Sequence, residues 1–416
     1  MLTAAQLLAS LRTPRTVAVR SDGTLIHDLK AKQQKRAQKG FTGGKTPVAV
    51  PGYDPPVAFS LAPATLLLCT GVATTPLVSL PVALSSHWAY YRYMWAFDSA
   101  SPLLQLEASV KDIDFHQKTV LSDELGVGMS HWLMTQVRGA VSHVDVHVAV
   151  KTPAIAQQHG FPNASLATRK SPDFIYHFGG GRFGVVECKG NQSGRAQSLD
   201  QIVSGLEQVP SLRINNARLA EEYVVATHYS LRGTTVYIVD PPGDDPSSEP
   251  GAESERSDEP KGGPRKRRLS APDAEALADQ TDRLQAAKLL AFAGDEQRAL
   301  DLVDLAEEGD LPPVPEPRAV EFADEATGLD IYGQRVDVTI RGAQAGVRRI
   351  EVVQGVATDV LSRLRDGEGA VRALGDGPLA EVFAGTDDRY LVRANGETGA
   401  VTALSSDGAV LRIRPA

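Results

Sequence analysis

The chain has 416 residues, of which 42% are hydrophobic and 23% are charged, and its formal net charge at pH 7 is -8. This length accommodates two or three domains of ordinary size, and the composition is that of a globular protein. The net charge excludes a uniformly basic protein that coats nucleic acid, so any contact with phosphates must come from local patches.

The cysteines and the N-terminus both bear on the compartment. Cys69 and Cys188 are the two cysteines of the chain, which is too few for a disulfide framework or a zinc spacing. Residues 1–15 have no basic segment before their apolar run and no cleavage pattern after it, so we expect a short helix and not a signal peptide. A cytoplasmic protein is therefore predicted.

Residues 30–45 form a local basic patch, with six Lys or Arg and no acid. A helix and loop of this composition suits contact with phosphate groups. A solvated segment that contacts nothing has the same composition, so both interpretations stay open.

The segment from Pro55 to Tyr91 contains no Asp, Glu, Lys or Arg, and Val57–Leu84 is long enough to cross a bilayer. Prolines interrupt any helix here, and the apolar runs between them have the length of strands. We predict two or three buried strands, with membrane insertion as the less favoured alternative. The aromatic residues at 87–97 are expected in the core, although such a cluster can also stack on bases.

A helix is predicted over residues 116–138. Its stripe at helical spacing consists of Val120, Glu124, Val127, His131 and Met134. A carboxylate in line with apolar positions costs free energy unless a partner compensates it, which marks Glu124 as a candidate functional residue. Gly126 and Gly128 weaken the helix and indicate a close approach of another backbone. His131 is expected to be a core histidine.

The alternating residues 141–150 predict a strand. His143, Asp145 and His147 would then share one face, and such a stripe can bind a metal. One strand face rarely completes a metal site, so this remains a minor hypothesis.

A β-hairpin is predicted at residues 171–190. Asp173–Phe178 and Arg182–Lys189 are rich in aromatic and β-branched residues, and the three glycines at 179–181 separate them. A three-residue loop would pair Phe178 with Arg182, so that paired residue numbers sum to 360.

This register brings charged residues together. Asp173 would lie directly opposite Glu187, with Cβ atoms about 4.5–5.5 Å apart. Lys189 would share the face of Glu187, whereas Val186 and Cys188 would point into apolar packing. Facing carboxylates need a nearby cation, which is either a divalent metal held by oxygen ligands or simply Lys189 on a solvated sheet face.

Residues 195–209 are predicted to form a helix, followed by strands at 223–227 and 234–239. The buried face of the helix consists of Leu199, Ile202, Val203 and Leu206, and its polar stripe of Gln197, Gln201, Ser204 and Gln208. A Gly-, Pro-, Ser- and acid-rich stretch at 241–271, which ends in a basic block, predicts a disordered linker. Residues 272–312 are helical in pattern, and 313–416 show short alternating strands with one helix near 356–365, which predicts an additional small α+β or β module.

The order of these elements resembles the PD-(D/E)XK nuclease superfamily, which has the restriction-endonuclease-like fold. The matching residues are Pro172-Asp173, Glu187-Cys188-Lys189, Glu124 on the preceding helix and Gln201 on the following helix. The resemblance covers residues 115–240. It implies a mixed α/β core in which a central sheet is flanked by helices.

The resemblance also implies a set of metal ligands. Asp173 and Glu187 would bind one or two Mg²⁺ (or Mn²⁺) ions, and the carbonyl group of Cys188 would complete the shell. Glu124 would bind the metal directly or through water. Hydrolysis of a phosphodiester develops charge on the phosphoryl oxygens, which a metal ion offsets.

Two further roles follow from the same resemblance. Lys189 would be the catalytic base or an electrostatic clamp, and these two roles stay open. Gln201 is a weaker assignment, since Gln197 lies on the same stripe.

The sequence thus predicts a metal-dependent endonuclease that acts on nucleic acid, with DNA as the expected substrate. Restriction or defence against foreign DNA is expected by analogy. The rival hypothesis is a module of the same fold that binds or scaffolds with weak or silent catalysis. The expected organisation is an N-terminal region at 1–110, which folds separately or extends the sheet, a nuclease-like core at 111–240, and a C-terminal module that contacts a protein partner.

Overall fold

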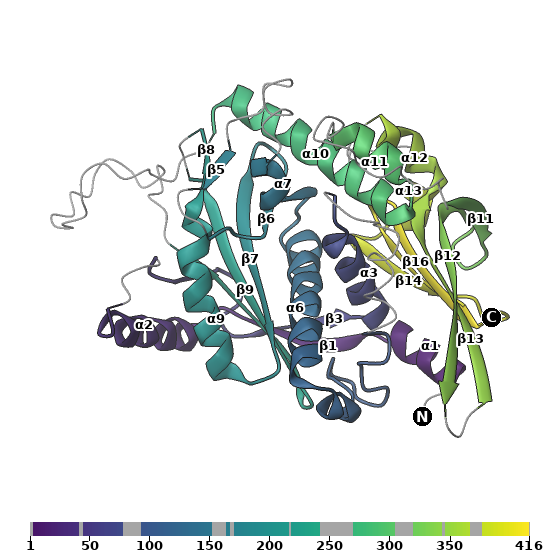
Figure 1. The fold of residues 1–416 in the computed structure, drawn as a ribbon, viewed down its shortest axis with the longest axis horizontal. Coiled ribbons are helices and arrows are strands. Elements are labelled where there is room, and N and C mark those ends of the chain that lie inside the picture. Colours follow the sequence, from purple (N-terminus) through teal and green to yellow (C-terminus); the bar gives the residue numbers. More distant parts are fainter. Residues whose placement is uncertain are drawn as a thin grey trace.

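The computed structural model describes residues 3–40, 45–77, 93–151, 164–166, 170–215, 218–241, 269–303, 319–342, 346–366 and 377–415. These residues form a mixed central sheet with helices on both faces and a separate antiparallel sheet at the C-terminal end (Figure 1). The predicted α/β architecture with an additional C-terminal sheet is therefore confirmed.

Helices and strands alternate through the central part of the chain. The helices are α1 (Ala4–Arg12), α2 (Gly23–Ala37), α3 (Pro63–Thr74), α6 (Phe115–Trp132), α7 (Val146–Lys151) and α9 (Arg195–Gln208). The strands are β1 (Arg15–Arg20), β2 (Val48–Ala49), β3 (Val57–Leu61), β4 (Ser142–Asp145), β5 (Ala164–Leu166), β6 (Phe174–His177), β7 (Phe183–Asn191), β8 (Leu212–Ile214), β9 (Glu221–Ser230) and β10 (Gly233–Asp240). Two short 3₁₀ helices span Ala108–Asp112 and Val209–Ser211, and a π-helical turn, Leu133–Val137, extends α6.

The central sheet has the strand order β3-β1-β10-β9-β7-β6-β4, and β2 pairs with the end of β10. The pairs β1–β10 and β7–β9 are parallel, and the other pairs are antiparallel. Because β1 and β3 join through β10, residues before 110 extend the same sheet that carries the predicted hairpin.

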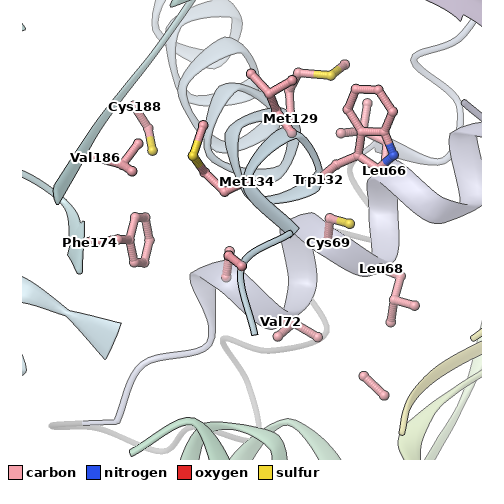
Figure 2. Packing of buried hydrophobic residues seen from close by; sticks show 14 of the residues in the cluster. Leu66, Leu68, Cys69, Val72, Met129, Trp132, Met134, Phe174, Val186 and Cys188 are labelled. Atoms are coloured by element: carbon pink, nitrogen blue, oxygen red, sulfur yellow. The ribbon is translucent and has the colours of Figure 1, made fainter. Parts of the chain in front are cut away.

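Helices cover the two faces of this sheet. Side chains alternate along β7, so Val186 and Cys188 face α6, whereas Glu187 faces α9. Figure 2 shows Val186 and Cys188 projecting toward Met134 and Met129, with Cys69 of α3 beyond. The apolar side of β7 therefore belongs to a core that includes the helices before it in the chain.

Glycines let α6 approach β7 very closely. A Cβ atom at Gly126 would lie 2.9 Å from the Cα atom of Gly190, and one at Gly190 would overlap the carbonyl oxygen of Ser122. The close approach that Gly126 and Gly128 indicated in the sequence is thus present. It fixes the first half of α6 beside the end of β7.

The apolar segment at 55–91 differs from its prediction. One strand, β3, is followed by the helix α3, whose N1 position is Pro63 and whose side chains are nearly all buried. A short apolar run without periodicity does not distinguish a buried strand from a buried helix, and proline at N1 starts a helix as readily as it interrupts one. Residues 78–92 lie outside the described ranges.

The described residues bear on two alternatives for this segment. Tyr93 and Phe97 are buried in the core, as expected for the end of the aromatic cluster. Among the described helices, none combines the length and the apolar character needed to cross a bilayer.

The strand predicted at 141–150 is shorter in the structure. β4 ends at Asp145, and the helix α7 begins at Val146, so His147 does not continue the face of His143 and Asp145. β4 pairs on one edge with β6. The predicted His-Asp-His stripe was wrong because helical geometry ends the strand alternation.

The helices after the linker connect the two sheets. They are α10 (Ala271–Ala293), α11 (Glu296–Val303), α12 (Thr358–Arg365) and α13 (Pro378–Phe383). The C-terminal sheet has the order β11-β12-β13-β16-β15-β14, with β11 (Val320–Asp324), β12 (Leu329–Gly342), β13 (Gly346–Ala357), β14 (Tyr390–Ala394), β15 (Val401–Ser405) and β16 (Ala409–Pro415). The linker predicted at 241–271 falls largely on 242–268, outside the described ranges.

Two side chains of α10 bind the edge strand β4. Gln285 accepts a hydrogen bond from the backbone N–H of His143 (2.8 Å) and donates one to Asp407 (2.7 Å) in the turn between β15 and β16. The buried Lys288 donates to the carboxylate of Asp145 (2.7 Å) and to the carbonyl group of Ala73 (2.7 Å). The C-terminal sheet is thereby tied to the edge of the central sheet.

The contact between α6 and β7 makes a prediction about stability. We expect Gly190→Ala to lower the free energy of unfolding by about 1–3 kcal/mol, because the added methyl group meets the backbone of α6. Gly23→Ala is the control, since no atom lies within 4 Å of its Cβ position. Urea denaturation measures both, and equal stability of the two variants would contradict the close approach.

Candidate active site

The hairpin β6–β7 has the predicted register. Phe174 pairs with Val186 and His177 with Phe183, so paired numbers sum to 360. The turn glycines at 179–181 all have positive φ (77°, 59° and 71°), which a β-branched residue would adopt only with strain. The N–H of Asp173 donates to the carbonyl group of Val186 (3.1 Å), which is the partner of Phe174, so the ladder is irregular at Asp173. Asp173 therefore lies near Glu187, on which its charge acts, but without the direct pairing that the sequence predicted.

Glu187 is a fully buried carboxylate beneath α9. A Cβ atom at Gly205 would lie 3.1 Å from Cγ of Glu187, so the helix rests directly on this side chain. The ammonium group of Lys189 forms an ion pair with the carboxylate. Within the described residues, neither carboxylate oxygen accepts a hydrogen bond of regular geometry. A buried charge with so few donors is costly unless a cation compensates it.

Asp173 lies at the start of β6, next to the pair of Glu187 and Lys189. Its carboxylate accepts a hydrogen bond from the backbone N–H of Cys188 (2.7 Å). This bond crosses between the two strands and holds the carboxylate at the edge of β7. One oxygen is thus oriented by the backbone.

The two carboxylates share an environment that disfavours two negative charges. Burial, together with the charges of Asp123 and Asp145, raises the pKa of Asp173 to about 6, although the Cys188 N–H and Lys189 act in the opposite direction. Burial and the charge of Asp173 raise the pKa of Glu187 to about 8, with Lys189 opposing. Such shifts are typical of functional sites, and a divalent cation would reverse them.

Lys189 responds in the opposite sense. Burial lowers the pKa of its ammonium group, but the charge of Glu187 outweighs burial and the pKa is raised overall. The side chain is half-buried and keeps its proton at neutral pH. The base and the electrostatic clamp both stay predictions for Lys189.

Two adjacent acids on α6 have different surroundings. The carboxylate of Glu124 binds the hydroxyl group of Tyr93. Asp123 is solvent-exposed. Partial loss of hydration raises its pKa overall, although the charge of Lys189 acts in the opposite direction. The charge of Asp123 in turn acts on Asp173. Glu124 as a metal ligand stays a prediction that these contacts do not support, and we add Asp123 to the candidate site.

Sequence reasoning missed Asp123 because it followed the stripe of Glu124. A signal was present in the glycines: Gly126 must face the approaching backbone, and Ser122 lies one turn before it. Asp123 flanks that face. It lies at the level of Gly190, which is the residue after Lys189 in β7. The side of a helix that carries glycine at a close contact is thus a better guide than its apolar stripe.

The polar stripe of α9 runs along β7. Gln201 donates to the carbonyl group of Gly190 (2.9 Å) and accepts from the side chain of Asn191 (2.9 Å). Gln208 donates to the carbonyl group of Ser171 (3.2 Å). Gln197, the competing residue, is exposed. The structure therefore brings Gln201 to the end of the strand that carries Glu187 and Lys189.

Cys188 contributes through its backbone. Its thiol group is buried on the α6 side of the sheet, and burial raises the pKa of the thiol. The thiol therefore does not reach the face of Glu187, in agreement with the predicted alternation (Figure 2). Its carbonyl group as a metal ligand stays a prediction.

The residues present suit a magnesium-type ion better than zinc. In the described ranges, no group of three or more His, Cys, Asp or Glu side chains is arranged to hold a metal. Mg²⁺ is commonly bound through one or two carboxylates, with water and substrate phosphate as its other ligands. Asp173 and the buried oxygens of Glu187 fit that donor set.

The histidines of β4 and α6 have a different role. His143 is fully buried against Tyr176, with ring centroids 5.5 Å apart, and against His131 at 4.4 Å. Burial lowers the pKa of His131 and His143, so both are neutral core residues. For His131 this agrees with the expectation from sequence.

Models of known protein families, curated proteins and solved structures contain no match to this chain. The candidate site is therefore defined by the geometry of Asp173, Glu187, Lys189, Asp123 and Gln201.

The raised pKa of Glu187 predicts how stability depends on pH without metal. The folded protein keeps a proton on Glu187 up to about pH 8, whereas the unfolded chain releases it near its ordinary pKa of about 4.3. The folded state therefore binds more protons in between, and the free energy of unfolding falls as pH rises from about 5 to about 8.

We expect Glu187→Gln to reduce this pH dependence, because the amide does not ionise. Urea denaturation in EDTA at several pH values measures it. Glu397→Gln, in an exposed turn, should retain the parent's slope. A parent-like slope in Glu187→Gln would show that Glu187 is not held protonated.

Proposed function

We propose that this protein is a metal-dependent nuclease whose active site is formed by Asp173, Glu187 and Lys189. The observation that carries the proposal is the buried carboxylate of Glu187, which lies close enough to Asp173 for their charges to interact and forms an ion pair with Lys189. The sequence also allowed a simple acidic pair on a solvated sheet face. Such a pair would not be covered by α9. DNA is the first substrate to test, in keeping with the resemblance noted above.

Asp173 and Glu187 would hold Mg²⁺ or Mn²⁺, which when bound offsets charge on a phosphate and lowers the pKa of a water ligand. The backbone N–H of Cys188 orients one oxygen of Asp173. α9 excludes water from Glu187. Both features preorganise the two carboxylates before any ligand arrives.

Lys189 supplies a fixed positive charge beside the carboxylates. Its raised pKa keeps the ammonium group charged at neutral pH, and in this state it stabilises negative charge on phosphoryl oxygens. With a cation bound to Glu187, the ammonium group of Lys189 would be available to the substrate. Gln201 fixes the end of β7 directly after Lys189 through Gly190 and Asn191.

Asp123 marks the open side of the site. It is exposed, whereas Glu187 is fully buried and Lys189 is half-buried. Substrate therefore approaches from the side of α6 and the end of β7. A carboxylate at this position suits a water-mediated contact with the cation.

The test is cleavage of plasmid and single-stranded DNA with Mg²⁺, Mn²⁺ or EDTA. We expect the parent to cleave with metal only, and Asp173→Asn and Lys189→Met each to lose at least about 100-fold in rate, because the first weakens the binding of the metal ion and the second removes a positive charge beside the reacting phosphate. Lys111→Met removes an exposed ammonium group outside the site and should cleave like the parent.

Two results would contradict the proposal. Cleavage that survives both active-site substitutions would mean that other residues catalyse it. Calorimetric binding of Mn²⁺ that depends on Asp173, without cleavage of any DNA or RNA, would instead support the rival function, a binding or scaffolding module with silent catalysis.

A further inference from the structure

Packing of apolar side chains does not explain why the second half of α2 is helical. Leu25 and Leu29 are the buried residues of α2, and from Lys30 to Ala37 no side chain is buried. Most helices in proteins are stabilised by packing an apolar face, which this half lacks. In Figure 1, α2 lies beside α9 and projects beyond the sheet.

Ion pairs hold α2 along α9. Lys32 binds Asp200 (2.7 Å) and the carbonyl group of Ala196 (2.8 Å), and Arg36 binds Glu207 (3.2 Å). A third pair joins Asp28 to Arg195 at 2.6 Å. These contacts fix the side of α2 that faces α9 and therefore also fix the side that faces solvent.

The solvent side of this segment carries an excess of positive charge. Residues 29–40 contain five Lys or Arg and no acid. Asp200 and Glu207 neutralise Lys32 and Arg36, which leaves the exposed Lys30, Lys35 and Lys39. Basic residues in the last turn of a helix also complement its dipole, but by only about 0.3–1 kcal/mol. That effect does not account for two further turns of unpacked helix.

This basic surface adjoins the candidate active site. Glu207, the partner of Arg36, also pairs with the exposed Lys170 (2.6 Å), which immediately precedes the segment leading into Asp173. The next residue of α9, Gln208, binds the carbonyl group of Ser171. Arg36, Glu207 and Lys170 thus link α2 to the segment that leads into Asp173.

We propose that the exposed Lys30 and Lys35 of α2, together with Lys39 in the turn that follows it, dock the sugar-phosphate backbone of a nucleic acid duplex without reading its sequence. The inference deepens the proposed function and rests on it for the choice of ligand. Positively charged side chains on a rigid helix match evenly spaced phosphates, and each phosphate contact releases counterions. The net charge of -8 disfavours a general attraction to nucleic acid, so docking would depend on a local excess of positive charge such as this one.

The test is fluorescence anisotropy of a labelled DNA duplex in EDTA, so that no cleavage occurs, at several salt concentrations. The variant Lys30→Gln/Lys35→Gln/Lys39→Gln should bind at least about tenfold more weakly at about 0.1 M salt. Its slope of log affinity against log salt should fall by about 2–3, since each phosphate contact contributes about 0.9. The control Arg12→Gln/Arg298→Gln/Arg393→Gln removes the same charge from exposed positions of α1, α11 and β14, and should bind like the parent.

Separate outcomes test the inference and the proposed function. Equal affinity and slope in the two triple variants would overturn the docking role, because net charge alone would then explain binding. The triple lysine variant could lose binding to vesicles that contain anionic lipid and still bind the duplex like the parent. This result would also overturn the docking role and point to a membrane surface. The parent protein could cleave no nucleic acid while Lys189→Met binds the duplex as tightly as the parent. In that case docking by α2 would be supported and the nuclease proposal would fail.

Discussion

A buried carboxylate on a sheet face is the constraint around which the centre of this molecule is built. Glu187 is removed from water by α9, and the ion pair with Lys189 offsets only part of the cost of desolvation. The hairpin then brings Asp173 close by, and its charge adds repulsion. The fold therefore holds two carboxylates and one ammonium group in an arrangement that packing alone would not select, and a divalent cation is the simplest group that relieves it.

Close helix contacts on both faces of β7 maintain this arrangement. Gly205 lets α9 rest on Glu187 from one side, and Gly126 with Gly190 lets α6 approach from the other. The strand cannot move away from either helix without losing core contacts on the Cys188 side. Asp123 gains its position from the same approach, since it lies on α6 beside Gly190.

The C-terminal part of the chain acts on this site through the sheet edge. β4 is an edge strand, and unpaired edge groups are a liability that proteins cover. Gln285 accepts a hydrogen bond from the backbone N–H of His143 on the outer edge of the sheet, and the buried Lys288 neutralises Asp145. The N–H of Val146 in turn donates to the carbonyl group of Asp173 (2.9 Å). The position of Asp173 is therefore coupled to residues more than 100 positions later.

Local rules were sufficient for the hairpin. Three glycines between two β-rich runs set the turn, period-two alternation set the faces, and from these the register of Phe174–His177 with residues 183–186 follows without tertiary information. The irregular bond of Asp173 just before this ladder was not predictable in the same way. The polar stripe of α9 was likewise predictable, because it depends on periodicity within a single element, whereas the mixed sheet was expected only from the family resemblance.

Only the tertiary structure decided the rest. Whether the run after Pro63 is a strand or a helix depends on what buries it, and α3 is surrounded by the core on all sides. The choice between Asp123 and Glu124 depends on which side of α6 meets β7. The pairing of Lys288 with Asp145 spans 143 residues, and no local pattern encodes such a contact. Sequence determines what neighbouring residues do to one another, and packing determines which distant charges share a site.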